Sequence, residues 1–173
     1  SSWAPFLIHS VSLIKKGGRL AMVVPAELSY TAYSKNVLDF LLSQFETLSV
    51  LTFQKRLFPR LGEDTFIVLG ENRKTPTKAF NLINVLNEKK LEAYTTCKND
   101  LSVVGEIHTL SRGEVQNLRL QKTRLIEHLL SDELRTLYSD LGELETTRTL
   151  GSIAKVGIGY VTGHNDFFHV SKA

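Results

Sequence analysis

The stretch from Ile14 to Leu42 constrains the fold of this chain more than any other. A polar Lys-Lys-Gly-Gly turn leads into an apolar run, Leu20 to Val24, which ends at Pro25 and is followed by a helical pattern. An apolar run without alternation is typical of a strand that is buried on both faces, as in an α/β sheet. Because a loop follows this strand directly, we expect the loop after Val24 to face a binding site.

Helical and strand-like patterns alternate up to residue 70. The spacing of apolar residues predicts helices over residues 3–14 and 35–45, the second capped by Ser34, and strands near residues 48–53 and 65–70. Alternation of this kind favours an α/β sheet. The last two strands are joined by a short loop without a helix, so we expect an antiparallel hairpin at the edge of an otherwise parallel sheet.

Beyond Asn72 the composition becomes more polar and the expected elements become shorter. The pattern predicts a strand over residues 79–86, a brief helix over residues 88–94, a strand over residues 103–110 and a turn at "SRGEV". Leucines with helical spacing between Thr123 and Leu144 indicate a helical region with a docking face. Three glycines among apolar residues follow, and we expect a new structural region to begin there.

Composition excludes several classes of protein and site. Hydrophobic residues make up 42% of the 173 residues and charged residues 23%, as is normal for a folded protein. No apolar run approaches the roughly 18 residues that a membrane span needs. The single cysteine, Cys97, excludes an intrachain disulfide and a cysteine-based zinc site, and it fits a reducing cytosol. The net charge of +3 is compatible with an anionic partner but is too small to indicate one.

Motifs that would identify a cofactor or a catalytic mechanism are missing. Gly157, Gly159 and Gly163 resemble a dinucleotide-binding fingerprint, but the position where the third glycine belongs holds Thr162. The sequence has no Walker-type phosphate loop, no His-Glu-x-x-His motif and no Gly-x-Ser-x-Gly motif. The five histidines are scattered, and none shares metal-ligand spacing with another on an expected helix. The sequence therefore indicates no metal site.

The loop between the two hairpin strands, "QKRLFPRLGED", places Phe58 and Pro59 among the cations Lys55, Arg56 and Arg60. One interpretation is a hydrophobic plug surrounded by solvated charges. The other is an aromatic platform for a nucleic-acid base, and base stacking on an aromatic ring is worth on the order of 1–3 kcal/mol. Lys and Arg beside it would add a salt-dependent attraction to the phosphate backbone. The local pattern leaves both interpretations open.

Three blocks of this sequence resemble adenine-specific DNA N6-methyltransferases of restriction–modification type. "LIKKGGRLAMVVPAEL" is similar to the family segment Leu-Leu-Lys-x-Gly-Gly-x-Leu-x-x-Val-Val-Pro-Ala, which follows the catalytic loop. "LFPRLGEDTFIVL" resembles a later block in which Phe-Pro ends the loop before the final hairpin strand, and "GIGYVTGHNDFF" resembles a Gly-Ile-x-Thr-Gly-x-Asn-x-x-Phe segment near the target-recognition domain. The blocks occur in the family's order, and the resemblance covers residues 3–72 and 149–173.

The resemblance implies the second half of a Rossmann-like sheet of a methyltransferase that uses S-adenosylmethionine, with a terminal antiparallel hairpin. We therefore expect residues 1–95 to be the C-terminal half of a catalytic domain, residues 96–148 a connecting strand and helical segment, and residues 149–173 the start of a target-recognition domain. The family's donor loop and its catalytic Asn/Asp-Pro-Pro-Tyr/Phe loop have no match here, since the sequence has no Pro-Pro pair. We expect a piece of a longer enzyme that is inactive alone and that exposes an apolar sheet edge near Leu20–Val24.

The resemblance also implies which residues contact DNA. These enzymes flip the target adenine out of the duplex, because its amino group cannot be reached inside the base stack. By position, the flipped base would lie against Phe58, Pro59 would shape the turn, and Pro25 would border the cleft on the adenine side. The last block would form a structural turn or a DNA-side contact through Thr162, Gly163 and Asn165.

Three hypotheses follow for the function. The first is a site-specific DNA adenine N6-methyltransferase whose partners are double-stranded DNA and the remainder of its polypeptide, in the cytoplasm of a bacterium or archaeon and without a membrane partner. The second is a non-catalytic DNA-binding or assembly module that retains the methyltransferase half-fold. The third is an unrelated α/β protein whose Gly-Gly and Phe-Pro motifs are coincidental.

Overall fold

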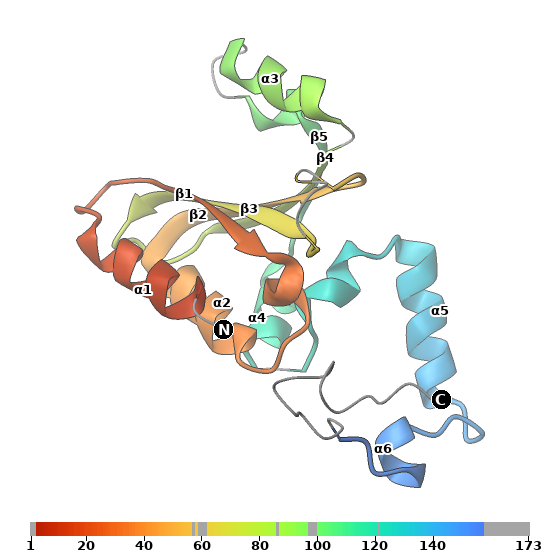
Figure 1. Cartoon of the computed structure of the whole chain (residues 1–173). Coiled ribbons are helices and arrows are strands. Elements are labelled where there is room, and N and C mark those ends of the chain that lie inside the picture. The colour runs from red at the N-terminus through yellow and green to blue at the C-terminus, as the bar shows by residue number, and fades with distance from the viewer. Residues whose placement is uncertain are drawn as a thin grey trace, which may run out of the picture. The chain divides into compact units, whose positions relative to one another are not determined.

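The computed structural model describes residues 3–56, 58, 62–85, 87–96, 100–120 and 122–157. The chain divides into two compact units, Ser1–Ser131 and Asp132–Ala173, which are described separately. The first unit contains a mixed sheet with helices packed on it (Figure 1). The domain boundaries predicted after residues 95 and 148 stay predictions, because a division into compact units does not test assignments of function.

The described residues of the first unit form five strands in one sheet, in the order β1-β3-β2-β4-β5. The strands are β1 (Leu20–Pro25), β2 (Phe45–Phe53), β3 (Thr65–Arg73), β4 (Ala79–Val85) and β5 (Gly105–Thr109). The helices are α1 (Trp3–Leu13), α2 (Ser34–Gln44), α3 (Glu88–Thr96) and α4 (Arg112–Arg119), with short 3-10 turns η1 (Ala26–Ser29), η2 (Leu101–Val103) and η3 (Leu125–Leu129). The predicted alternation of helices and strands is confirmed.

Strand β3 pairs antiparallel with both of its neighbours, β1 and β2. Strands β1 and β2 therefore run in the same direction, β4 pairs parallel with β2, and β5 pairs antiparallel with β4. The predicted antiparallel hairpin of β2 and β3 is confirmed, but its predicted place at the edge of the sheet is wrong. Both hairpin strands lie in the interior of the sheet, because β3 also pairs with β1 and β2 also pairs with β4.

The larger core lies between one face of the sheet and helices α1 and α2, which lie on the same side of the sheet (Figure 1). Successive side chains of a strand point to opposite faces, and β2 shows this alternation. Its Leu48 and Val50 belong to the larger core, whereas Leu51 belongs to a second cluster that packs under α3 and η2. Ile67 and Leu69 of β3 also pack against the second cluster, so among the described residues the sheet is covered on both faces over β2, β3 and β4.

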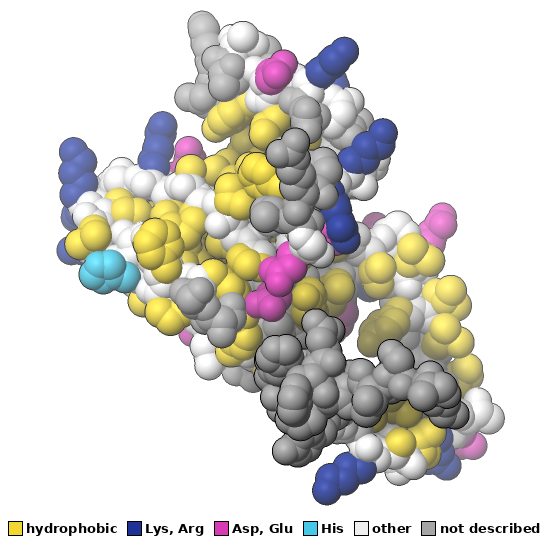
Figure 2. Space-filling view, in the orientation of Figure 1, with side chains coloured by type: hydrophobic (Ala, Val, Ile, Leu, Met, Phe, Trp, Pro, Cys, Tyr) yellow, Lys and Arg dark blue, Asp and Glu magenta, His cyan; other side chains and the backbone are white. Residues whose placement is uncertain are grey.

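The prediction that residues 20–24 are buried on both faces is wrong for the described structure. Leu20 and Val24 are buried in the larger core, but Val23 is 49% exposed. The second cluster does not extend to β1, which lies at the edge of the sheet and pairs only with β3 among the described strands. The expected apolar edge is thus present, and Figure 2 shows hydrophobic side chains gathered over α1 and the neighbouring part of the sheet.

Two further differences from the predicted elements have local causes. The "SRGEV" sequence does not form a turn, because Ser111 caps α4 in a reciprocal capping box with Glu114. Ser34 is not the cap of α2 but its first residue, and its hydroxyl donates a hydrogen bond to the carbonyl of Thr31 at 2.7 Å.

In the second unit the described helices are α5 (Asp132–Glu143) and α6 (Leu150–Ile153). The single helical region predicted between Thr123 and Leu144 is divided, since η3 ends at Leu129 and α5 begins at Asp132. Apolar residues with helical spacing along α5 are about half exposed, among them Leu134 at 53% and Leu137 at 52%. None of the helices in the described part of the chain is long and apolar enough to cross a membrane.

We predict that Gly105→Ala destabilises the first unit. A Cβ atom at Gly105, in β5, would lie 2.0 Å from the backbone carbonyl oxygen of Asn84 in β4. Because that neighbour is backbone, the strands would have to move apart, and overpacking of this kind costs about 1–3 kcal/mol. The measurement is the free energy of unfolding in urea.

Gly113→Ala is the matched control, because the nearest atom to a Cβ at Gly113 is the Ser111 hydroxyl oxygen at 4.0 Å. Gly113 lies in α4, and alanine is favoured over glycine in a helix by about 1 kcal/mol. We expect this variant to be as stable as the wild type or more so. Equal stability of the two alanine variants would contradict the β4–β5 pairing.

Candidate nucleic-acid interface

A cleft of about 400 Å³ opens at the end of β1 and is lined by residues of β1 and of the chain that enters β3. The lining residues are Val23, Val24, Pro25, Gly62, Glu63 and Thr65. Since β1 and β2 run in the same direction, their carboxyl ends lie at the same edge of the sheet. Ligands of open α/β sheets bind outside the carboxyl ends of strands. The position and the volume of the cleft are therefore those expected of a small-molecule or base-binding site.

Asp64 anchors the segment Gln54–Asp64, called the β2–β3 segment below, against the end of β1. The backbone N–H of Ala26 donates to the carbonyl oxygen of Asp64 at 2.8 Å, directly after Pro25. Arg56 Nε also donates to Asp64 Oδ1 at 2.8 Å. This ion pair is exposed and is worth at most about 1 kcal/mol. The pair nevertheless joins Arg56, near the end of β2, to Asp64, which directly precedes β3.

The structure describes four of the nine predicted site residues, namely Pro25, Lys55, Arg56 and Phe58. Pro25 lines the cleft. Phe58 is 40% exposed and does not line the cleft, Lys55 is exposed, and Arg56 is paired with Asp64. The other predicted residues lie outside the described ones, and they are Pro59, Arg60, Thr162, Gly163 and Asn165.

A hydrogen-bonded cluster that the sequence analysis missed holds η1, the turn after Pro25. Trp3 Nε1 donates to Glu27 Oε2 at 3.1 Å and to the Tyr33 hydroxyl at 3.0 Å. The Tyr33 hydroxyl donates to the same Glu27 oxygen at 2.5 Å. The cluster ties the first turn of α1 to both ends of the connection between β1 and α2. The residues that it joins are 24, 30 and 6 positions apart in the sequence, so no local pattern could predict the cluster.

Among the described residues, the carboxyl groups of Glu46 and Asp100 have lowered pKa values, and neither lines the cleft. Hydrogen bonds from the side chains of Lys78 and Asn72 lower the pKa of Glu46, at the start of β2. Hydrogen bonds from Ser102 lower the pKa of Asp100, which caps η2. Both carboxylates therefore stabilise local structure. Among the described residues, no group of three or more His, Cys, Asp or Glu could hold a metal ion.

Residues 122–173 match the family model of the C-terminal domain of the type II methyltransferase M.Eco57I. This match confirms the resemblance to restriction–modification methyltransferases. It includes the segment that holds Thr162, Gly163 and Asn165, and it extends over residues 122–148, where the sequence blocks showed no resemblance. Among curated proteins, none matches this chain.

The solved structures that are similar to the chain include the following three. The type IIG restriction endonuclease BpuSI has a TM-score of 0.51 at 16% identity, over 80% of this chain and 17% of that one. A type I restriction–modification system has a TM-score of 0.49 at 21% identity, over 69% and 30% of the two chains. A modification subunit of a type I restriction enzyme from Vibrio vulnificus YJ016 has a TM-score of 0.48 at 18% identity, over 65% and 28%.

The likeness to BpuSI shows the fold alone, a mixed α/β sheet shared with a type IIG restriction endonuclease. This chain spans less than a third of the length of each of the three proteins.

We predict that Glu27→Ala releases Trp3 without unfolding the chain. Trp3 is the single tryptophan, so its fluorescence reports this site alone. Loss of the Glu27 carboxylate removes an acceptor shared by Trp3 and Tyr33, and the emission maximum should move to longer wavelength. Net loss of such hydrogen bonds costs about 1 kcal/mol, so the urea midpoint should fall only slightly.

The control for this prediction is Glu63→Ala, which removes a carboxylate from the wall of the cleft. Glu63 makes no hydrogen bond with Trp3, and we expect the emission maximum of this variant to equal that of the wild type. Identical spectra for the two variants would show that Glu27 does not hold Trp3 in solution.

Proposed function

We propose that this chain is part of a site-specific DNA adenine N6-methyltransferase of restriction–modification type. Such an enzyme transfers a methyl group from S-adenosylmethionine to an adenine that has been flipped out of the duplex. The observation that carries the proposal is the cleft at the carboxyl edge of the sheet, where Pro25 meets the end of the β2–β3 segment. The match of residues 122–173 to a methyltransferase domain supports it.

In this proposal the β2–β3 segment presents an aromatic ring to the flipped base. Phe58 is the candidate, since its side chain is 40% exposed and the segment that carries it is anchored at Asp64. Pro59 would shape the turn beside it, and Pro25 would form the wall of the base site. Lys55 would attract a backbone phosphate.

The remaining candidates take supporting roles. Arg56 would hold the β2–β3 segment through Asp64 and would reach a phosphate only by exchanging that partner. Arg60 would add to the attraction for the DNA backbone. Thr162, Gly163 and Asn165 would form the DNA-side turn that their sequence block implies.

S-adenosylmethionine would supply the methyl group when it is bound. The described residues do not fit this donor, because the glycine-containing donor loop that the resemblance implies has no counterpart in the sequence. The catalytic Pro-Pro motif is also missing from the chain. In the proposal both come from the remainder of the same polypeptide, and a further strand pairs with the free edge of β1. In this proposal the partners of the chain are double-stranded DNA and the remainder of its polypeptide, in the cytoplasm of a bacterium or archaeon.

A second candidate function is a DNA-binding or assembly module without catalysis. The lack of a donor loop and of a Pro-Pro pair in this sequence favours it. It predicts DNA binding without donor binding, even in the longer protein that contains the chain.

The proposal predicts that the longer protein transfers labelled methyl groups from S-adenosylmethionine to DNA, whereas this chain alone does not. Label recovered as N6-methyladenine would support a methyltransferase that acts on adenine. DNA binding by the longer protein without any label, on mixed-sequence DNA that contains every short recognition site, would favour the module without catalysis.

Phe58→Ala in the longer protein should lower methylation, because it removes the surface on which the flipped base stacks. Loss of about 1–3 kcal/mol of stacking corresponds to a roughly 5- to 150-fold lower kcat/KM for DNA. The affinity for S-adenosylmethionine should stay the same. Leu13→Ala, which shortens a 74% exposed side chain at the end of α1, is the control and should leave both quantities unchanged. An unaltered methylation rate in Phe58→Ala would remove Phe58 from the site.

A further inference from the structure

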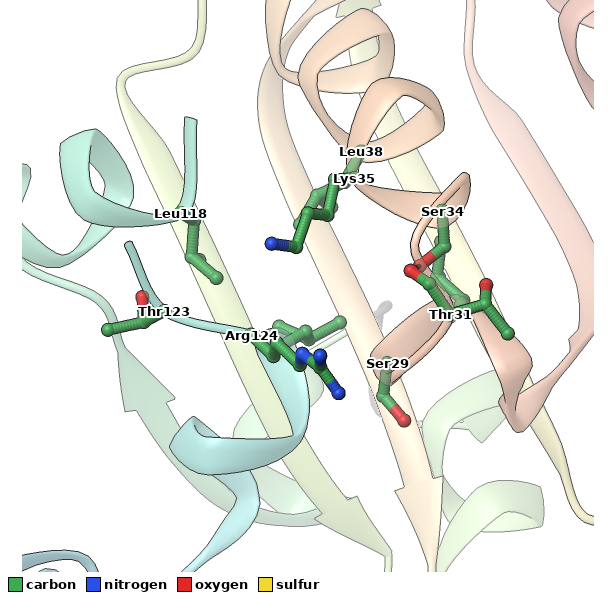
Figure 3. Close-up of a pocket in the computed structure, with 10 residues that line it drawn as sticks. Ser29, Thr31, Ser34, Lys35, Leu38, Leu118, Thr123 and Arg124 are labelled. Atoms are coloured by element: carbon green, nitrogen blue, oxygen red, sulfur yellow. Dashed lines mark hydrogen bonds between the residues drawn. The ribbon is translucent and has the colours of Figure 1, made fainter. Parts of the chain in front are cut away.

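The chain between β1 and α2, residues 26–33, is called the β1–α2 connection below, and hydroxyl groups hold it against its own backbone. Ser29 Oγ donates to the first carbonyl oxygen of η1 at 2.8 Å. Thr31 Oγ1 donates to the carbonyl oxygen of Glu27 at 2.9 Å, and Ser34 Oγ donates to that of Thr31 at 2.7 Å. Figure 3 shows the three side chains on the same side of a pocket. The connection is therefore a fixed support for the side chains that it carries.

Tyr33, the last residue of the β1–α2 connection, has its ring held by two other residues. Its hydroxyl donates to Glu27 Oε2 at 2.5 Å and accepts from Trp3 Nε1 at 3.0 Å. The rings of Tyr33 and Trp3 also contact each other, with centroids 5.9 Å apart and an interplanar angle of 49°. Trp3 in turn packs against the larger core. The Tyr33 ring is therefore fixed in place, yet the residue is 39% exposed.

The face of the Tyr33 ring is what this cluster offers to a ligand. Its hydroxyl already donates one hydrogen bond and accepts another, so the exposed ring supplies a stacking contact. Aromatic side chains bind the flat faces of nucleic-acid bases in this way. A phosphate is disfavoured at this point, because the Glu27 carboxylate next to the Tyr33 hydroxyl would repel it, whereas a base is uncharged.

The position of the cluster relates it to the cleft at the end of β1. Pro25 lines the cleft, and Glu27 follows two residues later. Two residues of chain span at most about 7 Å. Because the Tyr33 hydroxyl is bonded to Glu27, the ring lies at the same edge of the sheet as the cleft.

We propose that Tyr33, held by Glu27 and supported by Trp3, stacks on a second base of the DNA, one that is exposed where the duplex opens around the flipped nucleotide. The inference rests on the proposed function, because a flipped base in the cleft is what brings opened DNA to this edge. Proteins that open a duplex insert side chains against the bases that lose their stacking partners. A ring fixed before DNA binds loses little conformational freedom in such a contact.

The test measures the affinity of the longer protein that contains this chain for two single strands of equal length, without methyl donor. One strand has mixed sequence and exposes its bases, and the other is abasic and keeps only the phosphates and sugars. In Tyr33→Leu, affinity for the strand with bases should fall roughly 5- to 150-fold, which corresponds to about 1–3 kcal/mol of stacking. Affinity for the abasic strand should stay as in the wild type, because the phosphate contacts are unaltered.

Two control variants separate the ring from other effects. Tyr33→Phe keeps the ring and should retain wild-type affinity for both strands. Tyr138→Leu removes a ring that is 62% exposed on α5, and the ratio of its two affinities should equal that of the wild type. A wild-type ratio in Tyr33→Leu would overturn the proposal, whether both affinities fall equally, as expected of a purely structural residue, or neither changes.

Methyl transfer to duplex DNA by the wild type, measured on the same preparation, tests the proposed function separately. Label in N6-methyladenine together with an unaltered ratio in Tyr33→Leu would refute only the base contact. A lowered ratio in Tyr33→Leu without any label from the wild type would uphold the base contact and count against the methyltransferase.

Discussion

The double pairing of β3 is the constraint on which the rest of the first unit depends. Strands β1 and β2 run in the same direction, and β3 forms antiparallel ladders with both of them. The ladder with β1 places Thr65 opposite Pro25, so the chain that enters β3 must pass the end of β1. A cleft between Pro25 and the end of the β2–β3 segment is therefore a consequence of strand pairing.

At the same edge of the sheet, two acidic residues accept the hydrogen bonds that hold the chain beside the cleft. Asp64 accepts from the Ala26 N–H through its carbonyl and from Arg56 through its carboxylate. The Glu27 carboxylate, in η1, accepts hydrogen bonds from the side chains of Trp3 and Tyr33. None of these contacts contributes much free energy alone, but each one joins the chain beside the cleft to a neighbouring element. These residues therefore contribute more to the placement of the chain around the cleft than to the stability of the fold.

Local periodicity was sufficient to predict the helices and strands up to β4, because apolar spacing records which side chains face the core. It could not place the hairpin inside the sheet, since the β1–β3 ladder joins residues distant in sequence and leaves no local pattern. The Ser-x-x-Glu signature of the α4 capping box was present at Ser111 and was read as a turn. Pro25 lines the cleft and was predicted near it from resemblance, whereas Trp3, Glu27 and Tyr33 are distant in sequence and meet only through folding.

Arg56 shows why composition could not indicate the partner. It lies in the cation-rich segment that suggested DNA, yet in the described structure its guanidinium is paired with Asp64. A net charge of +3 counts a paired cation in the same way as an unpaired one. Attraction for phosphate depends on the charges that stay uncompensated in the folded chain, and that is a property of the fold.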